Sequence, residues 1–569
     1  MPSFCIQVGH VILRMHRSLE YVRRIRDMGA SLLVLVTIAF LLLGYIFYGR
    51  YISHKFDLES KRTTPAHTQR DGVDYVPAKA PVLLGHHFSS IAGAGPILGP
   101  IYAAIFGWIP VFLWILVGSV FVGGVHDFSS IVASVRHGGK SIGEVIEDHI
   151  GEAGKRLFLI FAWFALVLVV AVFCRAVAST FVKSPEAATS SLLFIGLAIL
   201  FGLSIYRLKI HLGLATLVGV SLLLVCVYLG MRFPFSLPYN TWLYVLFVYI
   251  FIASVTPVWI LLQPRDFLNS FLLYLVLLVG IVGIFVANPK ITFPAFDGFQ
   301  TNLGTLFPIL FVTVACGAIS GFHSLVSSGT TSKQLDRESD AKVVGYGSML
   351  IEGLLAVIAL ITAVTVIRGD YSRLITTEGG GPIGIFSSGV GGFISTLGIP
   401  IEIGVTFAAL AISAFALTSL DTATRLARFM FQEFFEKEDR PTVLSRNRYV
   451  GTLVTVLFAA LLALSGTGNM LWPMFGSANQ LLAAIALLAV TVWLAELQKE
   501  NRFVKIPMYF MFCVTLTALG MLIHKNLVAK NITLFLIAIL LFVVAVFLVL
   551  QARKSLQKIG GQTKEATSS

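Results

Sequence analysis

Apolar runs of about 18 to 24 residues recur along nearly the whole sequence, and each is close to the roughly 20 residues with which a helix spans a bilayer. The runs are continuous, whereas a membrane β-strand shows about ten residues of alternating polarity. Only 12% of the 569 residues are charged, against about 25% in an average soluble domain. The sequence therefore predicts an all-α polytopic membrane protein.

We expect about fifteen transmembrane helices, because that is the number of runs long enough to cross the hydrocarbon core. They lie at approximately residues 30–49, 88–107, 108–135, 157–180, 187–205, 211–230, 242–262, 267–287, 305–322, 346–367, 401–424, 449–465, 472–496, 507–524 and 531–550.

Basic residues orient these helices, since short loops rich in Lys and Arg stay in the cytoplasm. Placing residues 50–85 inside puts most Lys and Arg in inside loops and in the C-terminal tail. The net charge of +13 then reflects topology and contact with anionic lipid headgroups, and it predicts no nucleic-acid partner. The arginine-rich segment before the first run disagrees with this orientation. A natural start at Met28 would remove the disagreement.

The runs and loops divide the chain into seven consecutive regions. We expect an N-terminal arm, a peripheral helix, a cytoplasmic loop, a ten-helix core, a second cytoplasmic loop, four accessory helices and a polar cytoplasmic tail, at residues 1–29, 30–49, 50–85, 86–424, 425–448, 449–550 and 551–569. A multi-pass protein of the cell (inner) membrane follows from this organisation.

Cysteine usage and motif content exclude several classes of protein. The five cysteines are scattered one to a segment, which is not the spacing of a disulfide framework, a zinc site or an iron–sulfur cluster. The sequence has no GxxxxGK[ST] phosphate loop, nucleophile elbow or dinucleotide fingerprint. We therefore expect no enzyme, no cofactor and no metal site. Any transport would have to be driven by a gradient.

The stretch "GAGPILGP" places Gly93, Ala94, Gly95 and Pro96 inside an apolar run. Proline removes a helical hydrogen bond and glycine lets the chain turn. Irregular backbone at membrane depth survives only where protein or a water-filled cavity lines it. We predict two half-helices here, whose ends offer carbonyls to a cation and N–H groups to an anion. Glycine-mediated helix packing with a mild kink is the alternative.

A second interruption is predicted in "SVTPVWILLQP", where Thr256 and Pro257 stand in the run 242–262. It lies five spans after the first and runs in the opposite direction. Interrupted helices in corresponding positions of two inverted halves mark the binding site of a transporter. The sequence thus predicts a core of two inverted five-helix repeats with broken first and sixth helices, and a substrate site formed by 93–96 together with Thr256 and Pro257.

Ionisable residues inside the spans are functional candidates, because each costs roughly 2.5 to 3.5 kcal/mol at the bilayer centre. At the inner level we expect a polar, ion-coupling cluster, with a possible partner from the facing half of the core; its members are His86, His87, His126, Asp127 and Glu352. For His323 and Asp421, placement at the membrane boundary is the simpler interpretation. Ser327 and Ser328, in "SGFHSLVSSGTTSKQL", offer hydroxyl oxygens to a cation or cap a helix end.

Several long stretches together resemble the carbon starvation protein A family: "DGVDYVPAKAPVLLGHHFSSIAGAGPILGP", "SIGEVI", "PVWILLQPRDFLNSF", "LFPILFVTVACGAISGFHSLVSSGTTSKQL", "GYGSMLIEG", "LDTATRLARFMFQE" and "LWPMFGSANQLLAAIAL". The resemblance runs from about residue 50 to 500. It implies the amino acid, polyamine and organocation transporter superfamily, with an inverted repeat whose first and sixth core helices are broken. It also implies uptake of peptides or pyruvate under starvation, coupled to protons.

We therefore expect a secondary active importer of a small carbon source, working by alternating access with a proton as the coupling ion. Sodium coupling on the same fold is the first alternative. A signalling or scaffold protein of the starvation response is the second, and it would leave the paired helix breaks unexplained. The expected partners are the small-molecule substrate, the coupling ion and membrane lipids.

Overall fold

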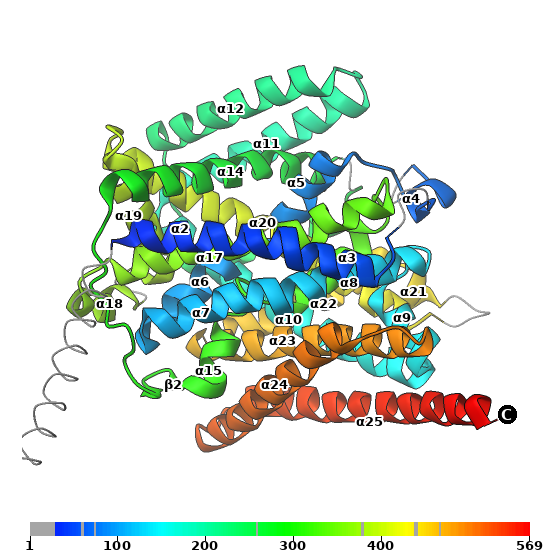
Figure 1. The fold of residues 1–569 in the computed structure, drawn as a ribbon. Helices are drawn as coiled ribbons and strands as arrows, with labels where there is room; N and C mark the ends of the chain where they lie inside the picture. Colours follow the sequence, from blue (N-terminus) through cyan, green and yellow to red (C-terminus); the bar gives the residue numbers. More distant parts are fainter. Residues whose placement is uncertain are drawn as a thin grey trace, which may run out of the picture.

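The computed structural model describes residues 29–568, except 59–61, 73–74, 258–259, 377–379, 437–441 and 466–467. Helices make up nearly all of it (Figure 1). The sheet in this part of the chain is one antiparallel pair, β1 (Gln300–Thr301) and β2 (Gly304–Thr305). The predicted all-α fold is confirmed. The arm up to residue 28, with the expected start at Met28, lies outside the described residues.

Helices of the first half follow the predicted runs. They are α2 (Ala30–Leu43), η1 (Gly44–Tyr48), α3 (Gly49–Lys55), α4 (Pro65–Thr68), α5 (Ala80–Ile91), α6 (Gly95–Ala103), η2 (Ala104–Phe106), α7 (Trp108–Gly118), η3 (Ser119–Gly123), α8 (Gly124–Arg136), α9 (Ile142–Ile150), α10 (Glu152–Lys183), α11 (Pro185–Tyr206), α12 (Leu212–Arg232), α13 (Tyr239–Val255) and α14 (Leu262–Ala287). Here η2 is a 3₁₀ turn, and η1 and η3 are π-helical.

The second half begins after the sheet. It contains α15 (Leu306–Thr313), α16 (Gly321–Val326), η4 (Ser327–Thr331), η5 (Glu338–Asp340), η6 (Lys342–Gly347), α17 (Ser348–Val364), α18 (Arg368–Leu374), α19 (Gly381–Ser395), α20 (Ile401–Phe434), α21 (Val443–Arg446), α22 (Arg448–Leu464), α23 (Gly468–Glu496), α24 (Arg502–Val528) and α25 (Ile532–Ser568). The expected loop 425–448 is helical up to Phe434, and the expected polar tail continues α25.

Eleven helices in the described ranges are long and apolar enough to cross a membrane, and twelve if the bent pair α5–α6 is one span. The multi-pass membrane character predicted from composition is confirmed. Two shorter apolar helices, α13 and α22, have 17 residues each. The predicted count of about fifteen spans is reached when α13, α22 and the pair α15–α16 are added to these twelve. That count stays a prediction.

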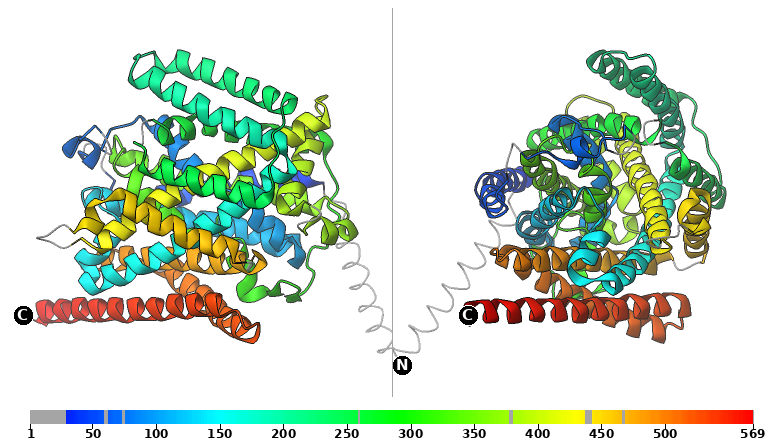
Figure 2. Two further views of the ribbon diagram at one scale, coloured as in Figure 1. Left: turned by 180° about the vertical axis from the view of Figure 1, so that it is seen from behind. Right: turned by 90° about the vertical axis from the view of Figure 1, so that its right-hand side faces the viewer.

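The long helices α10 and α20 pack along each other, and the other core helices surround them. The hairpin of α11 and α12 lies on one side of this bundle, and α24 and α25 lie on the opposite side (Figures 1 and 2). α12 and α25 leave most of their apolar surface exposed, whereas α17 and α23 are almost wholly buried. The outer helices therefore meet lipid and the inner ones form the core.

Two sets of helices make corresponding contacts around the α10–α20 pair. α14 packs on α5 as α23 packs on α16, and α13 and α22 each pack on both α10 and α20. Helices in equivalent places of an inverted repeat would make such contacts. The correspondence involves α22 and α23, which the sequence analysis places outside the core 86–424, and the pair α15–α16 instead of the run 242–262. The five-plus-five repeat itself stays a prediction.

The region between α17 and α20 contains a helix that the sequence did not predict. α19 has the sequence GPIGIFSSGVGGFIS, whose glycines favour a loop. It forms because small residues let it approach α20 closely: a Cβ on Gly404 would lie 2.9 Å from the Cα of Gly391. Tertiary packing here outweighs the intrinsic helix propensity.

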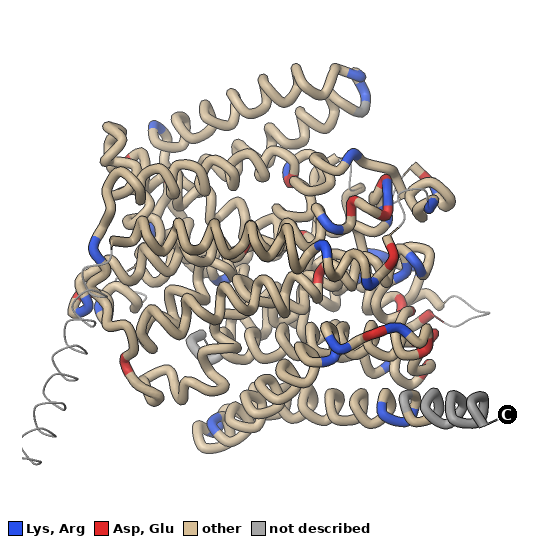
Figure 3. The backbone as a smooth tube through the Cα atoms, in the orientation of Figure 1, with Lys and Arg blue, Asp and Glu red and all other residues tan. Residues whose placement is uncertain are grey.

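Charged residues gather at one end of the helix bundle, at the right in Figure 3. α4, α9, α21 and the C-terminus all lie at this end (Figure 1). These elements belong to the loops and tail that the basic residues assign to the cytoplasm. The fold thus brings the segments predicted to be inside to a single face.

This arrangement predicts the outcome of topology fusions. Green fluorescent protein attached after Ser569 should fluoresce, because the C-terminus lies at the end that the basic residues predict to be cytoplasmic. Alkaline phosphatase fused after Lys290, beyond the opposite end of α14, should be active. Phosphatase activity at the C-terminus, with none at Lys290, would contradict the orientation.

Candidate functional site

The first predicted helix break is present. α5 ends at Ile91, because Ala92 leaves helical geometry with φ −78° and ψ 65°. α6 begins at Gly95 with Pro96 in its first turn, where a missing N–H costs nothing. The two half-helices are bent by 47° from each other. The mild-kink alternative is therefore not what the chain adopts.

The glycines at this break permit close approach of neighbouring helices. A Cβ on Gly93 would lie 2.3 Å from the Oγ of Ser419, on α20. A Cβ on Gly95 would lie 2.3 Å from the Sγ of Cys316. Real Cβ atoms do not tolerate such distances, so both positions require glycine in this packing.

The second break lies in the predicted ninth span, between α15 and α16. Residues 314–320 are not helical, and side chains from other helices bind their polar backbone and flanking groups. Trp114 Nε1 donates to the Val314 carbonyl at 3.1 Å, and the Phe322 N–H donates to Asn479 Oδ1 at 2.9 Å. Asn479 Nδ2 also donates to Ser320 Oγ at 2.9 Å. These bonds satisfy groups that lipid could not.

The two breaks lie side by side in the core. Besides the Gly95–Cys316 approach, a Cβ on Gly99 would lie 2.6 Å from the Thr313 carbonyl oxygen. A Cβ on Gly317 would lie 3.7 Å from the Cα of Pro96. Two interrupted spans therefore meet near Gly95, as expected for a transporter core.

Thr256 and Pro257 are not the partner of this break, which corrects the sequence interpretation. α13 runs without interruption to Val255, and the two residues begin the connection to α14. Arg425 of α20 donates to the Thr256 carbonyl. In the same helix, Ser419, which contacts Gly93 at the first break, lies six residues before Arg425. That separation is about 9 Å along a helix axis. The proline here ends a helix instead of dividing one.

A chain of four ionisable side chains adjoins the second break; we call it the Asp127 cluster (His126, Asp127, His323 and Glu352). Asp127 Oδ1 is 2.8 Å from His126 Nδ1, and its Oδ2 is 2.8 Å from His323 Nδ1. His323 Nε2 is 3.4 Å from Glu352 Oε2. The cluster joins α8, α16 and α17.

All four side chains of the Asp127 cluster have no exposed surface. Within the described residues, neither carboxylate oxygen of Glu352 has a hydrogen-bond partner, and nor does Nε2 of His126. Buried polar atoms are normally hydrogen-bonded, so this combination is costly for stability alone. Such groups are typical of sites that exchange a proton or an ion.

His86 and His87 face different neighbours. His87 Nδ1 lies 2.8 Å from Thr331 Oγ1, on the segment that follows His323. His86 instead faces α14, with Nδ1 3.5 Å from Asp266 Oδ2. The structure therefore brings His126, Asp127 and Glu352 together, places His87 beside them, and separates His86 from them.

The two serines of the hydroxyl-rich stretch differ in their contacts. Ser328 Oγ donates to the Ser324 carbonyl at 2.8 Å and accepts from the Ile142 N–H at 3.3 Å. Ser327 Oγ is buried and has no hydrogen-bond partner in the described part of the chain. Ser327 is thus the better placed of the two to bind a cation.

Three π-helical segments flank the members of the Asp127 cluster. η3 precedes His126, η4 follows His323 and η6 precedes Glu352. The Tyr346 hydroxyl in η6 donates a hydrogen bond to the Val120 carbonyl in η3 at 3.1 Å. This bond gives a backbone acceptor of η3 a partner. π-Bulges frequently occur at functional sites.

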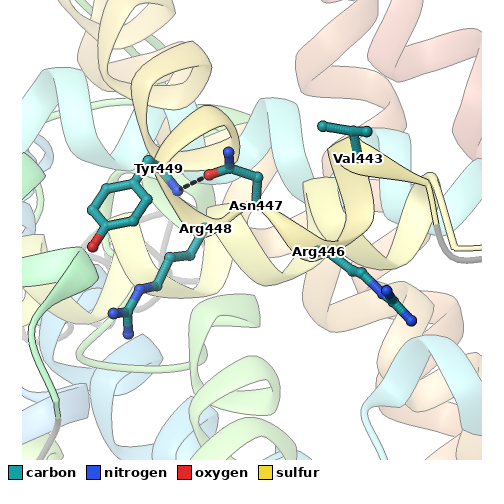
Figure 4. Close-up of a pocket in the computed structure, with 5 residues that line it drawn as sticks. All are labelled: Val443, Arg446, Asn447, Arg448 and Tyr449. Atoms are coloured by element: carbon teal, nitrogen blue, oxygen red, sulfur yellow. Dashed lines mark hydrogen bonds between the residues drawn. The ribbon is translucent and has the colours of Figure 1, made fainter.

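A hollow of about 460 Å³ lies away from these residues, at the start of α22, and is lined by Val443, Arg446, Asn447, Arg448 and Tyr449 (Figure 4). Asn447 Oδ1 accepts from the Tyr449 N–H at 2.9 Å. This hollow is open to solvent and contains no member of the Asp127 cluster. The helix breaks, which carry the unusual chemistry, therefore remain the candidate site.

Comparison with known proteins identifies the family. The family model described as carbon starvation protein CstA matches residues 29–380 and 374–518. The chain belongs to this family. It is 34% identical to the peptide transporter CstA of Campylobacter jejuni over 562 residues, covering 86% of this chain and 80% of that protein.

Two Escherichia coli proteins are also similar. The chain is 33% identical to the peptide transporter CstA, covering 86% of this chain and 81% of that protein. It is 30% identical to the pyruvate/proton symporter BtsT, covering 88% of this chain and 82% of that protein. The relatives of this chain are thus named as transporters, and a secondary transporter is the function class that they support.

Solved structures show the fold. A manganese transporter of Eremococcus coleocola superposes with a TM-score of 0.52 at 13% identity, covering 86% of this chain and 99% of that one. Among the described residues here, no group of three or more His, Cys, Asp or Glu side chains has the arrangement of a metal site. At 13% identity, the likeness is one of fold alone.

Sequence reasoning missed two residues of the site. His323 was assigned to the membrane boundary, but it bridges Asp127 and Glu352. Asn479, in the "GSANQ" stretch of α23, holds the second break. The available signal was the run "VACGAIS", which has three small residues (Ala315, Gly317 and Ala318) and a serine inside an apolar span.

The packing at the breaks predicts that Gly95→Ala destabilises the protein by about 1 to 3 kcal/mol, because the added methyl group overlaps Cys316. Cys316→Gly in the same chain should restore most of the stability. Gly196→Ala, where a Cβ meets nothing within 4 Å, is the matched control. Thermal unfolding in detergent measures all three; equal behaviour of Gly95→Ala and Gly196→Ala would show that the breaks do not pack this way.

Proposed function

We propose that the chain is a secondary active importer of a small carbon source, a pyruvate-like carboxylate or a short peptide. Protons drive it, and it works by alternating access. The observation that carries this proposal is the buried Asp127 cluster, which lies next to the two helix breaks. The names of the family's members, peptide transporter and pyruvate/proton symporter, support the same substrate classes and coupling ion.

The substrate's carboxylate is expected at the start of α6. Ile97 and Leu98 both donate their N–H groups to the Ala94 carbonyl, and Pro96 has none. The N–H groups of Ala94 and Gly95 are then the donors that this half-helix can offer, at its positive dipole end. A pyruvate-like acid and a peptide both present a carboxylate, so one site can serve either class.

Charge balance makes the Asp127 cluster a proton-binding site. With both carboxyl groups ionised and both imidazoles neutral, it would hold two unbalanced negative charges in the membrane interior. Each unpaired buried charge costs several kcal/mol. Bound protons remove that cost.

Because His323 lies three residues past Ser320, at the end of the second break, a change in the breaks would alter its contacts with Asp127 and Glu352.

Asp127→Asn tests this role. The substitution keeps the shape of the side chain but cannot exchange a proton, so accumulation of labelled pyruvate against a gradient should fall to the equilibrium level in proteoliposomes. Counterflow exchange, which needs no net proton movement, should largely persist. Asp148→Asn, on the partly exposed α9, is the matched control.

Two results would overturn proton coupling through this cluster. One is accumulation by the Asp127→Asn protein in response to an imposed pH gradient. The other is uptake driven by sodium alone in the unmodified protein, which would move the coupling site toward Ser327 and Ser328.

A further inference from the structure

A second buried network of ionisable side chains adjoins α5; we call it the Arg265 network (His86, Tyr249, Arg265, Asp266 and Asp421). Arg265 forms an ion pair with Asp421 and lies 3.5 Å from Asp266 Oδ1. Tyr249 accepts from Arg265 Nη1 at 2.6 Å and donates to Asp421 Oδ2 at 2.7 Å. Four elements meet here: α5, α13, α14 and α20.

The network is shielded from solvent. Relative exposure is 1% for Arg265, 0% for Asp266, 1% for Asp421 and 6% for His86. Several of its polar atoms have no hydrogen-bond partner within the described residues: both ring nitrogens of His86, Oδ1 of Asp266 and Oδ1 of Asp421. His86 Nδ1 lies 3.5 Å from Asp266 Oδ2 without forming a hydrogen bond.

The charges of the network do not balance without a further proton. Two carboxylates share the single positive charge of Arg265, which leaves one negative charge buried in the protein. A lone buried charge costs several kcal/mol. An imidazolium at His86 would cancel it, because His86 lies within ion-pair distance of Asp266.

We propose that the Arg265 network is a second proton-binding site of this protein, with His86 holding the proton as the counter-ion of Asp266. The ligand is a single proton from the aqueous phase. This site is separate from the Asp127 cluster, since the two share no residue. The neighbouring histidines of α5 thus face different sites, His86 toward α14 and His87 toward Thr331.

Other ionisable side chains on the elements packed against α5 are Tyr274, His323, Lys342, Tyr346, Glu352, Glu402, Arg425, Arg428 and Glu433. The ring of Tyr274 stacks on Phe88 of α5, Glu402 is exposed and Glu433 accepts from Ser141. Arg425 and Arg428 donate to carbonyls at the end of α13, and Lys342 lies over the ring of Tyr45. Tyr346 bonds to η3, and His323 and Glu352 belong to the Asp127 cluster. Among the described residues, Arg265 and His86 are the cation-forming side chains within ion-pair distance of Asp266.

Charge-balanced substitutions test the proposal without any transported substrate. His86→Gln should lower the apparent melting temperature in detergent by about 5 °C, because it removes the counter-ion and leaves a net negative charge. Adding Asp266→Asn to the same chain should restore most of the loss, because both missing charges then cancel. The paired control is His87→Gln, which Asp266→Asn should not rescue.

The protonation state can be read directly in the unmodified protein. Nitrogen-15 NMR of histidine-labelled protein in lipid bilayers at pH 7 should show one buried imidazolium that disappears in His86→Gln. The same signal should become neutral imidazole in Asp266→Asn. If the His86→Gln protein does not fold, the change of this signal in Asp266→Asn decides the matter.

Either of two results would overturn the second site. One is a neutral imidazole at His86 in the unmodified protein at pH 7. The other is a His86→Gln protein as stable as the unmodified protein, or one that Asp266→Asn does not rescue. Because neither measurement involves a substrate, they stand or fall independently of the transport proposal.

Discussion

The absence of water from the hydrocarbon core is the constraint on which this structure depends. Every backbone N–H and carbonyl at that depth must find a partner in the protein, so a helix can be broken only where other helices supply one. The chain meets this demand with Asn479 and Trp114 at the second break. At the first, glycines let α20 and residue 316 approach the backbone closely. Both breaks are therefore placed in the same part of the core.

The same constraint governs the ionisable residues. Carboxylates inside a membrane persist when cations or protons compensate them. Each of the two networks adjoining the broken helices contains two carboxyl groups, and only the Arg265 network has a permanent cation. The Asp127 cluster relies on imidazoles, whose charge depends on bound protons. The ionisable side chains and the helix breaks thus lie on the same elements, since the half-helices α5 and α16 carry His86, His87 and His323.

The sequence predicted the elements whose signals are local. Apolar runs predicted the helices, and the two prolines and three glycines of GAGPILGP marked the first break correctly, because these residues act on their own backbone. The basic loops predicted which segments share an end of the bundle, as Figure 3 bears out.

Signals that depend on packing were misread. Proline in Thr256–Pro257 resembles a helix breaker in the middle of an apolar run, but the run contains the end of one helix and the start of the next. The true second break has no proline between residues 314 and 320 and is held by side chains remote in sequence. His86 and His87 are adjacent in sequence, yet a rotation of about 100° per helical residue turns them toward different neighbours.

Internal pH is the most direct measure of the central claim, that substrate and proton cross together through the broken-helix core. Purified protein is reconstituted into liposomes that contain a fluorescent pH indicator, in sodium-free buffer, and pyruvate is added outside with no imposed pH gradient. The account predicts that the lumen acidifies as labelled pyruvate enters, faster than in protein-free liposomes. Pyruvate entry through the protein without acidification, or entry only when sodium is supplied, would contradict it.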